Sequence, residues 1–473
     1  MDSKAVLDIF KKITTIPRES GHEEAMVQWL KDWASEHSLD CKCDKVGNIL
    51  ITKEAHESKK HVPAIVIQAH QDMVCEKIAG SSHNFATDPI RYDIEDGWMI
   101  AKETTLGADD GIGIASALAL LEDPAPKGKV ECLFTISEET DMNGAEHLEE
   151  GFFSGKTLIN VDSEDEGEIF IGCSGGLNTV IDFELKLTEI KKGWKTIRLS
   201  VEGGLGGHSG DDINKDRMNT LQQLCRFLYN ENKSEMQLCQ IDGGNKSNAI
   251  ARDASAIIAV PDAEASIERF KTFGATVNTE FHNTDPDVKF TATEAIAEKA
   301  VEAGQATSIL AALYACPHGV QAMSQDVPGM VQTSTNFASV KMLSEDRLCV
   351  VTSQRSPAPS ERHMIADKIV ALFTLAGGKA EKILEYPGWE PNPNSAVLKR
   401  CVDTYVRLFG KKPVVRAIHA GLECGMFLTK FPDLDMISFG PTLRGVHAPG
   451  EKLDLASLDR YNALLEDMVN NFE

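Results

Sequence analysis

Length, composition and charge limit what this chain can be. It has 473 residues, enough for two or three domains, and 42% of them are hydrophobic, which is ordinary for a globular protein. Lys and Arg number 48 against 72 Asp and Glu, so the net charge is −24. A surface this acidic repels phosphate backbones and anionic lipids, so we expect neither a nucleic-acid nor a membrane partner.

The sequence also predicts a compartment. No apolar run is long enough to cross a bilayer, and residues 1–10 read as an amphipathic helix without the apolar core of a signal peptide. The 11 cysteines are scattered and include no Cys-x-x-Cys pair. Reduced cysteines in a cytoplasmic protein explain this usage best.

The first part of the chain alternates short apolar runs with helical patterns. Runs at 64–69, 129–136 and 157–161 predict buried strands, and the Ala-rich run at 111–121 predicts a buried helix. This alternation is typical of an α/β layer with largely buried strands.

The pattern changes near residue 190. Several segments then alternate apolar and polar residues, as half-exposed strands do, with helical patterns between them. The strand-like segments are 196–201, 254–260, 288–293 and 339–352, and the helical ones are 218–228, 263–274, 307–315 and 361–376. They predict an inserted α+β domain over residues 187–386.

A Pro-rich stretch at 387–394 ends the insertion. A helix, a strand at 434–439 and a helix at 455–469 then resume the style of the first part. We therefore predict one α/β domain formed by residues 1–186 and 387–473, interrupted by the inserted domain.

A histidine and an aspartate follow the first predicted strand, in the sequence His70-Gln-Asp72. In an extended chain both side chains lie on the same side. The imidazole can then bind a metal through one nitrogen while the carboxylate fixes the other. The alternative is a loop histidine beside a solvated acid.

The buried helix opens with two aspartates between glycines, over residues 107–111. A carboxylate here lies at the positive end of the helix, and the glycines permit a tight turn. Asp109 and Asp110 fit a metal ligand as well as they fit a plain helix cap, so the local pattern leaves both roles open.

Further candidates stand after predicted strands: the pair Glu138 and Glu139, then Asp162, and His447 beyond the last strand. Adjacent carboxylates can divide the work, one binding metal and the other acting as a base. The carboxyl ends of strands form the ligand-binding edge of open α/β sheets. Two histidines with three or four carboxylates suit zinc, with manganese or cobalt as alternatives, and match the needs of a bridged two-metal site.

These motifs, in this order, resemble the metal-site motifs of the zinc aminoacylase and carboxypeptidase-G family of metallopeptidases, and within it the aminoacyl-histidine dipeptidases. The closer resemblance rests on six segments spread over nearly the whole chain: 106–113, 206–213, 247–251, 333–336, 419–425 and 444–449. It implies an α/β catalytic domain with a dinuclear zinc centre and a mixed sheet flanked by helices. The insertion would be an α+β lid that closes over the substrate.

The resemblance also implies the ligand set of the two zinc ions. One zinc would be bound by His70 and Asp162, and the other by Glu139 and His447. Asp109 would bridge the two ions.

Two neighbouring carboxylates receive other roles from the resemblance. Glu138 would be the general base, and Asp72 would orient the first histidine ligand. The chain departs from the dipeptidase branch at Asp110, where the branch often has Asn, and in the stretch around Thr333. We expect the first departure to leave the metal set intact.

The inserted domain contains a Gly-rich segment at 203–210. It lacks the Lys-Ser/Thr ending of a phosphate loop, so nucleotide binding is not expected. The resemblance assigns its His208 to stabilising the oxyanion that forms on the scissile carbonyl. The alternative is a Gly-rich turn with an exposed histidine.

A dipeptide presents a free carboxylate and a free amine. Arg355 is the candidate for the carboxylate, because a guanidinium binds it through two hydrogen bonds; the alternative is a surface ion pair. Asn248 would add a donor. Glu423 is the candidate for the amine, and His419 begins the same motif as a further substrate-binding candidate.

The resemblance therefore implies a zinc-dependent dipeptidase that hydrolyses free dipeptides through a metal-bridged water and a Glu base, and dipeptides ending in histidine are expected from the family alone. The alternatives are an N-acyl-amino-acid deacylase of the same family and a metal-binding protein without activity. The oligomeric state stays open, although the insertion is long enough to offer a homodimer contact. Whether the lid histidine acts in its own subunit or a neighbouring one also stays open.

Overall fold

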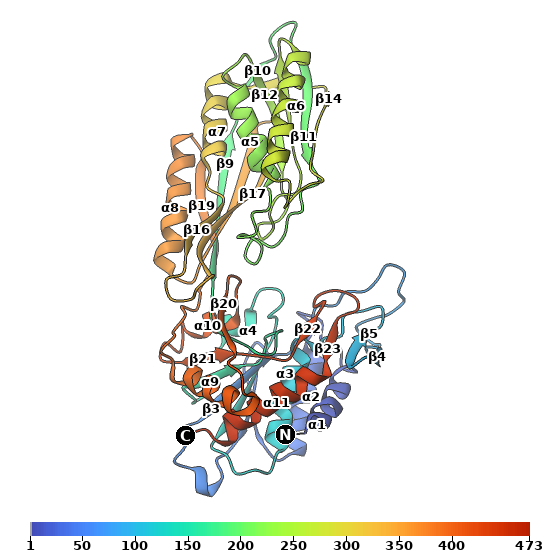
Figure 1. Ribbon diagram of the computed structural model, residues 1–473, viewed down its shortest axis with the longest axis vertical. Coiled ribbons are helices and arrows are strands. Elements are labelled where there is room, and N and C mark those ends of the chain that lie inside the picture. Colours follow the sequence, from blue (N-terminus) through green and yellow to red (C-terminus); the bar gives the residue numbers. More distant parts are fainter. Residues whose placement is uncertain (1) are drawn as a thin grey trace. The chain divides into compact units, whose positions relative to one another are not determined.

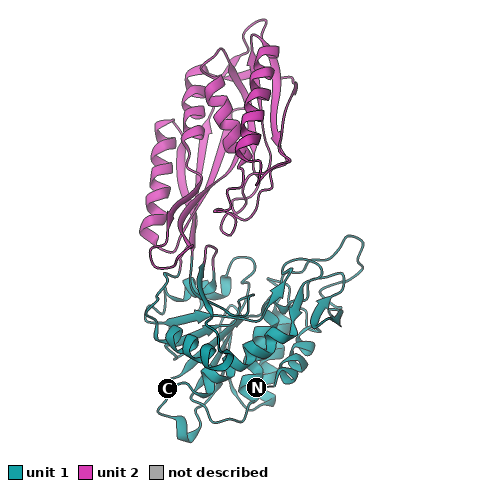
Figure 2. Ribbon diagram, in the orientation of Figure 1, with its two compact units in different colours: residues 1–173, 389–417, 422–473 teal, residues 174–388, 418–421 magenta. Residues whose placement is uncertain are grey.

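The computed structural model describes residues 2–473, which form two compact units (Figure 2). Unit 1 comprises the chain up to residue 173 together with 389–417 and 422–473. Unit 2 comprises 174–388 and the short segment 418–421. Over residues 2–473, no helix has the length and apolar character that a membrane span requires.

Unit 1 is built on an eight-stranded mixed sheet (Figure 1). Its centre is parallel, because β3 pairs in parallel with β6 and β7, and β7 with β21. The strands in spatial order are β1 (Asp40–Cys43), β2 (Ile49–Lys53), β6 (Val130–Thr135), β3 (Ile65–His70), β7 (Thr157–Asn160), β21 (Asp435–Ser438), β8 (Glu168–Cys173) and β20 (Val414–Ile418).

Helices flank this sheet, and a small second sheet lies beside them. The helices are α1 (Ser3–Ile13), α2 (Glu24–Glu36), α3 (Ala108–Glu122), α4 (Asn143–His147), α9 (Ala396–Phe409), α10 (Glu423–Phe427) and α11 (Leu455–Asn470), with a 3-10 turn at Glu57–Lys59. The second sheet has the order β22 (Leu443–Arg444), β23 (Lys452–Asp454), β5 (Trp98–Ala101) and β4 (Tyr92–Glu95).

Helix α3 is the buried helix that the Ala-rich run predicts. Small and aliphatic side chains cover its whole circumference, and almost every residue from Ala108 to Leu121 is buried. It packs against α1 and β3. A helix that is apolar all round is stable only inside a protein, so burial here is dictated by the composition of the helix.

Unit 2 contains a nine-stranded antiparallel sheet. Its strands in order are β14 (Lys289–Glu294), β11 (Lys195–Glu202), β13 (Ala254–Val260), β12 (Gln237–Gly243), β17 (Val331–Ser344), β18 (Arg347–Ser356), β9 (Gly175–Glu184) and β19 (Lys379–Tyr386), and β16 (Gly319–Met323) pairs with β17. A separate ladder joins β10 (Leu187–Glu189) and β15 (Lys299–Val301).

Four helices of unit 2 cover one face of this sheet (Figure 1). They are α5 (Thr220–Glu231), α6 (Ala263–Glu280), α7 (Ala303–Ala315) and α8 (Pro359–Leu375). Their apolar side chains, such as Leu224, Phe270, Ile309 and Ile369, meet those of the strands in a core of their own. The α/β architecture with an inserted α+β domain is thus confirmed.

The division between the units differs in detail from the predicted boundaries. Unit 2 begins at Ser174, not at residue 187, because β9 lies between β18 and β19 in its sheet. The sequence change near residue 190 marks a turn inside unit 2 and not its start. Residues 418–421 also belong to unit 2, although they lie far into the last segment of unit 1.

Candidate metal centre

Three neighbouring parallel strands bring the predicted ligands to one edge of the unit 1 sheet. His70 is the last residue of β3, Glu139 follows β6 on one side, and Asp162 follows β7 on the other. Asp109 stands at the start of α3, which packs on β3. Parallel strands present their carboxyl ends at the same edge, so groups that are distant in sequence converge there.

Asp109 contacts the histidines of both predicted donor sets. Its Oδ1 lies 3.0 Å from His70 Nε2, and its Oδ2 lies 3.1 Å from His447 Nε2. Asp162 Oδ1 lies 3.4 Å from the same His70 nitrogen, and Glu139 Oε2 lies 2.9 Å from the His447 nitrogen. The side chains therefore form two donor sets, one His and one carboxylate each, that share one carboxylate.

The electrostatics of these residues fit a bound cation. Burial raises the pKa of Asp162 to about 7, and the neighbouring Asp109 charge adds to the shift. Burial likewise raises the pKa of Glu139. Hydrogen bonds to Asp109 and Glu139 raise the pKa of His447 to about 11. So many buried carboxylates demand positive charge, which protons or divalent ions can supply, and the His and carboxylate donors are those that zinc, manganese and cobalt accept.

Asp72 holds the first histidine and the Glu loop together. Its Oδ1 lies 3.3 Å from His70 Nδ1, and its two oxygens accept the backbone N–H groups of Glu138 and Glu139 at 3.0 and 3.1 Å. Ser20 donates a further hydrogen bond of 2.7 Å. Although burial opposes it, these contacts lower the pKa of Asp72 to about 2, so the carboxylate stays charged. Asp72 therefore contacts both the histidine that it is predicted to orient and the loop of Glu138 and Glu139.

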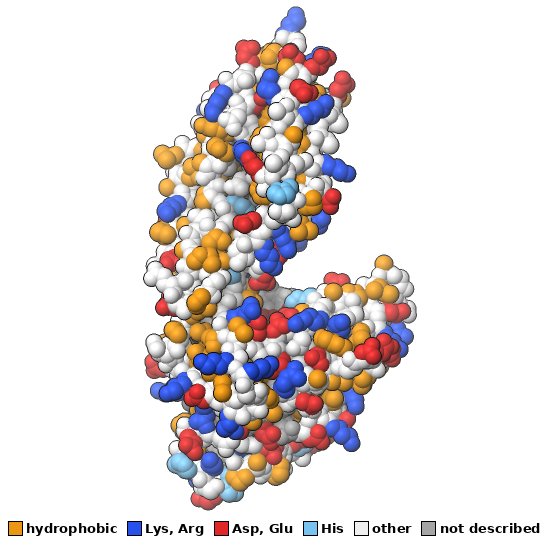
Figure 3. Space-filling model, in the orientation of Figure 1, with side chains coloured by type: hydrophobic (Ala, Val, Ile, Leu, Met, Phe, Trp, Pro, Cys, Tyr) orange, Lys and Arg blue, Asp and Glu red, His pale blue; other side chains and the backbone are white. Residues whose placement is uncertain are grey.

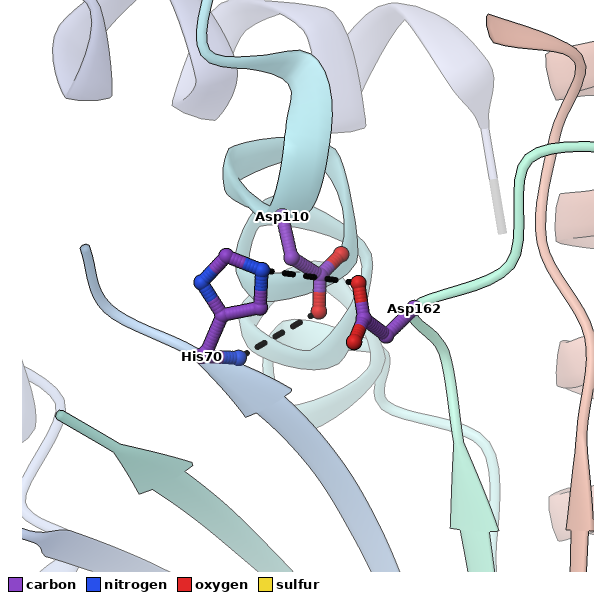
Figure 4. Close-up of side chains that lie close together, drawn as sticks. All are labelled: His70, Asp110 and Asp162. Atoms are coloured by element: carbon purple, nitrogen blue, oxygen red, sulfur yellow. Dashed lines mark hydrogen bonds and ion pairs between the residues drawn. The ribbon is translucent and has the colours of Figure 1, made fainter. Parts of the chain in front are cut away.

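Asp109 and Asp110, for which the sequence left two roles open, make different contacts. Asp110 Oδ1 accepts the backbone N–H of Gly113 at 3.1 Å, which caps the helix, and its Oδ2 accepts that of His70 at 3.3 Å. Figure 4 shows Asp110 and Asp162 pointing toward His70. By distance, Asp110 could join these two as a third metal donor, and each of its oxygens also accepts one backbone N–H group.

Glu138 lies beside the ligands on a fixed turn. Ser137, before it, has φ of +54° and binds Glu23 Oε1 through its N–H and its hydroxyl, at 3.0 and 3.1 Å. Burial raises the pKa of Glu138 well above its ordinary value, and the charges of Asp162 and Glu139 reinforce the shift. A carboxylate with a raised pKa beside a metal site is suited to accept and return a proton.

Unit 2 gathers its predicted substrate residues around Arg355. The guanidinium lies 3.5 Å from His208 Nε2, and it donates to Ser209 Oγ at 3.3 Å and to Tyr386 OH at 2.9 Å. The backbone carbonyl of Asn248 accepts the N–H of Ser209 at 2.8 Å. The cluster surrounds one guanidinium with histidine, serine and tyrosine groups, and Asp211 Oδ2 lies 3.5 Å from His208 Nδ1. A guanidinium can bind an anion such as a carboxylate.

His419 belongs to unit 2 and is a buried support. It is 7% exposed, and its two ring nitrogens contact Ser174 Oγ at 2.8 Å and Ser334 Oγ at 2.7 Å. Burial lowers the pKa of His419 to about 3, and nearby Arg355 adds to the shift. The imidazole is therefore neutral, and both its nitrogens are already occupied.

Glu423 belongs to unit 1 and is also buried, with 1% of its surface exposed. Its Oε2 accepts hydrogen bonds from Gln68 at 2.7 Å and Thr135 at 2.8 Å, on the strands that carry the metal ligands. Burial raises its pKa to about 8. Through Oε2, Glu423 supports the strands beneath the site, whereas its Oε1 has no hydrogen-bond partner among residues 2–473, and its role toward a substrate amine stays a prediction.

Several residues of the two sites escaped the sequence analysis. They are Arg18, Ser20 and Glu451 around the metal centre and Ser209 and Tyr386 around Arg355. Tyr386 immediately precedes the Pro-rich boundary, and Glu451 lies in the same loop as His447. Neither position follows a buried strand, which was the signal that found the ligands.

Comparison with known proteins agrees with this geometry. Residues 66–471 match the peptidase family M20/M25/M40. The chain belongs to this family. A relative, the cytosol non-specific dipeptidase of Escherichia coli (strain K12), is 37% identical over 98% of this chain and 96% of its own length.

Solved structures of similar proteins confirm the predicted resemblance and the fold. The aminoacylhistidine dipeptidase from Vibrio alginolyticus has a TM-score of 0.90 and 36% identity, covering 98% of this chain and 96% of that one. The aminopeptidase PepT from Bacillus cereus ATCC 10987 has a TM-score of 0.59 with 14% identity, covering 100% and 99%. The latter likeness shows the M20/M25/M40 fold alone.

Proposed function

We propose that this protein is a metal-dependent dipeptidase that hydrolyses the amide bond of free dipeptides, including those ending in histidine. The observation that carries the proposal is the pair of donor sets that share Asp109, with Glu138 beside them. Similarity over nearly the full length to a cytosol non-specific dipeptidase and to an aminoacylhistidine dipeptidase supports the substrate class.

Two zinc ions are the proposed cofactors, with manganese and cobalt as alternatives. His70 and Asp162 would hold one ion, Glu139 and His447 the other, and Asp109 both. Bound divalent ions make water more acidic and polarise a carbonyl oxygen.

The protein's own groups then move the proton. Glu138 takes a proton from the attacking water and returns it to the leaving amine nitrogen, which its raised pKa favours. Asp72 keeps His70 and the Glu138 loop in register through its three contacts. Asp72 therefore anchors the proposed base, Glu138, together with two proposed ligands, His70 and Glu139.

We propose that unit 2 acts as a lid that binds the dipeptide. Arg355, with Tyr386 beside it, would bind the substrate carboxylate, and Asn248 would add a donor. His208 would donate to the oxyanion on the scissile carbon. His419 would keep Ser334 in place through its 2.7 Å contact.

We also propose a cytoplasmic location, which the name of the Escherichia coli relative supports. Each of the eleven cysteines is free over residues 2–473, in keeping with a reducing compartment. The surface of unit 2 is the proposed place of a homodimer contact, which light scattering would test.

The test is hydrolysis of a dipeptide panel by purified protein with and without a chelator. The panel includes dipeptides ending in histidine, and the controls are their N-acetylated forms and matching tripeptides. We expect chelator-sensitive cleavage of free dipeptides alone. Cleavage of only the acylated compounds would indicate a deacylase instead, and metal-loaded protein that cleaves nothing would indicate a binding protein.

A further inference from the structure

The Glu451 carboxylate is buried against the start of α3, with 2% of the residue exposed. Its Oε2 accepts the backbone N–H groups of Leu106 and Gly107 at 2.7 and 2.9 Å. Its Oε1 accepts those of Ala108 and Asp109 at 2.8 and 3.3 Å. Four consecutive N–H groups, at the positive end of a helix, thus converge on one distant carboxylate.

A buried cation holds the same segment through its carbonyl. The Arg18 guanidinium, 2% exposed, donates to the backbone oxygen of Gly107. It also donates to the backbone oxygens of Gln71 and Asp72 at 3.0 and 2.6 Å. The segment that carries Asp109 is therefore fixed from both sides by charged groups, one of which also contacts the His70–Asp72 turn.

The loop of Glu451 also presents a metal ligand. Glu451 lies four residues after His447, and it leads directly into β23, which pairs with β5. The backbone oxygen of Glu451 accepts the N–H of Ala101 at 3.0 Å, and Gly450 donates to the oxygen of Thr104 at 2.9 Å. One short loop thus carries His447 and also forms hydrogen bonds with the segment that contains Asp109.

We propose that Glu451 is a positioning residue of the metal centre, which sets the separation of Asp109 and His447. Neither Glu451 oxygen is open to a cation, because each accepts two N–H groups. Its effect therefore passes through the two ligands that it connects. The effect is largest on the ion that they and Glu139 would hold, because the other ion shares only Asp109 with them. Ligands fixed before the metal arrives lose less entropy on binding, so their anchor raises affinity.

The test compares metal binding by the parent chain and Glu451→Gln. The amide nitrogen of Gln cannot accept hydrogen bonds, so two of the four backbone N–H groups would lose their acceptor. Chelator-treated protein is titrated with Zn²⁺ against a competing chelating dye. We expect one of the two equivalents to bind about 10- to 100-fold more weakly, as is common when a supporting group of a metal site is removed.

Glu131→Gln is the matched control. Glu131 is also a 2% exposed carboxylate of unit 1 that accepts two backbone N–H groups, from Ser154 and Gly155, at 2.9 and 2.8 Å. It stands at the opposite end of β6 from Glu138. We expect this variant to lose stability and keep both metal affinities. Equal weakening in both variants would assign the effect to general stability and overturn the proposal.

Unchanged affinity for both equivalents in folded Glu451→Gln would also overturn it. If that variant does not fold, Glu451→Asp is titrated, because it keeps the charge and only withdraws the carboxylate by one methylene. Weaker binding of one equivalent, with a changed visible spectrum of the Co²⁺ form, supports the proposal, and parental affinity and spectrum reject it.

The inference rests on the proposed function only for the existence of the metal centre. Since the titration needs no turnover, protein that binds metal but cleaves no dipeptide would refute the dipeptidase alone.

Discussion

Two adjacent aspartates show how neighbouring side chains of one type acquire different chemistry. Asp110 turns its carboxylate back to the N–H groups of Gly113 and His70, whereas Asp109 points both oxygens at histidine nitrogens. A Cβ at Gly113 would collide with the Asp110 carboxylate, so glycine is needed there. The Asp-Asp-Gly-x-Gly pattern therefore encodes a cap and a proposed ligand together, which explains why the local sequence alone left the choice open.

The proton-transfer role of Glu138 gives a direct prediction. Glu138→Ala removes the proposed base and leaves the five proposed metal ligands in place, so we expect kcat to fall by about 100- to 10,000-fold while two metal equivalents remain bound. Glu150→Ala is the control, since it comes from another Glu-Glu pair and is exposed. Turnover of the Glu138 variant within tenfold of the parent would remove this residue from the base role.

The neutral state of His419 predicts how acid affects the fold. Its pKa is lowered from 6.5 to about 3 in the folded chain, by burial first and then by Arg355 and the nearby His208, while Asp211 opposes the shift. As the pH falls, the imidazole of His419 is therefore protonated in the unfolded chain before it is protonated in the folded chain. The stabilisation is fully present above about pH 6.5 and is lost as pH falls toward the folded value, by about 2 kcal/mol at pH 5.

Urea unfolding of metal-free protein at about pH 7.5 and pH 5 checks this prediction. We expect His419→Gln to lose about 2 kcal/mol less stability between these pH values than the parent, whatever its stability at the higher pH. Chelated protein is used because acid also releases metal from its ligands. Equal acid sensitivity in both proteins would show that His419 does not remain neutral in the fold.

At the scale of elements, the strands that carry the proposed ligands can be predicted from the sequence because each is a continuous apolar run. The run at 157–161 corresponds to Thr157–Asn160, and the run at 129–136 to Val130–Thr135. Burial on both faces demands such runs, and the residues just after them are placed at the sheet edge by topology. This rule singles out His70, Glu138, Glu139 and Asp162 as candidates, whereas their roles come from the family resemblance.

Other elements were not predictable because their limits depend on partners. The alternating segment 339–352 is part of a hairpin, β17 and β18, whose strands extend well beyond it and turn at residues 345–346. The strand β9 is assigned to unit 2 by pairing with β18 and β19, which lie far along the chain. Glu451 and Tyr386 likewise acquire their roles through contacts across the sequence, and no local pattern encodes those contacts.

At the scale of the whole chain, acidic and basic side chains share the surface. Asp and Glu side chains alternate with Lys and Arg over the face in Figure 3. The exposed ion pairs, such as Lys11 with Asp8 and Arg91 with Glu103, are each worth little because water and salt screen them. The net charge of −24 therefore bears on solubility and on the choice of partners, while the cores determine the fold.

The metal ligands are distributed unequally over the chain. Every proposed ligand, with Asp72 and Glu451, lies in unit 1, whereas unit 2 has its own apolar core built from four helices and its sheet. Metal binding adds free energy to the state that binds it, about 3 kcal/mol when the free ion exceeds its dissociation constant a hundredfold. We therefore expect bound metal to stabilise unit 1 and to leave the stability of unit 2 unchanged.

Hydrogen exchange measured by mass spectrometry tests this last prediction, with Zn²⁺-loaded and chelated protein compared peptide by peptide. We expect chelation to speed exchange in peptides around residues 65–73, 106–113, 135–141 and 440–454, and to leave the unit 2 peptides of α5 to α8 within error. In Asp109→Asn, which lacks the shared carboxylate charge, we expect the same chelation to change the exchange rates of these peptides much less. Equal loss of protection in unit 2 would mean that the two units open together, because metal removed from one would then destabilise both.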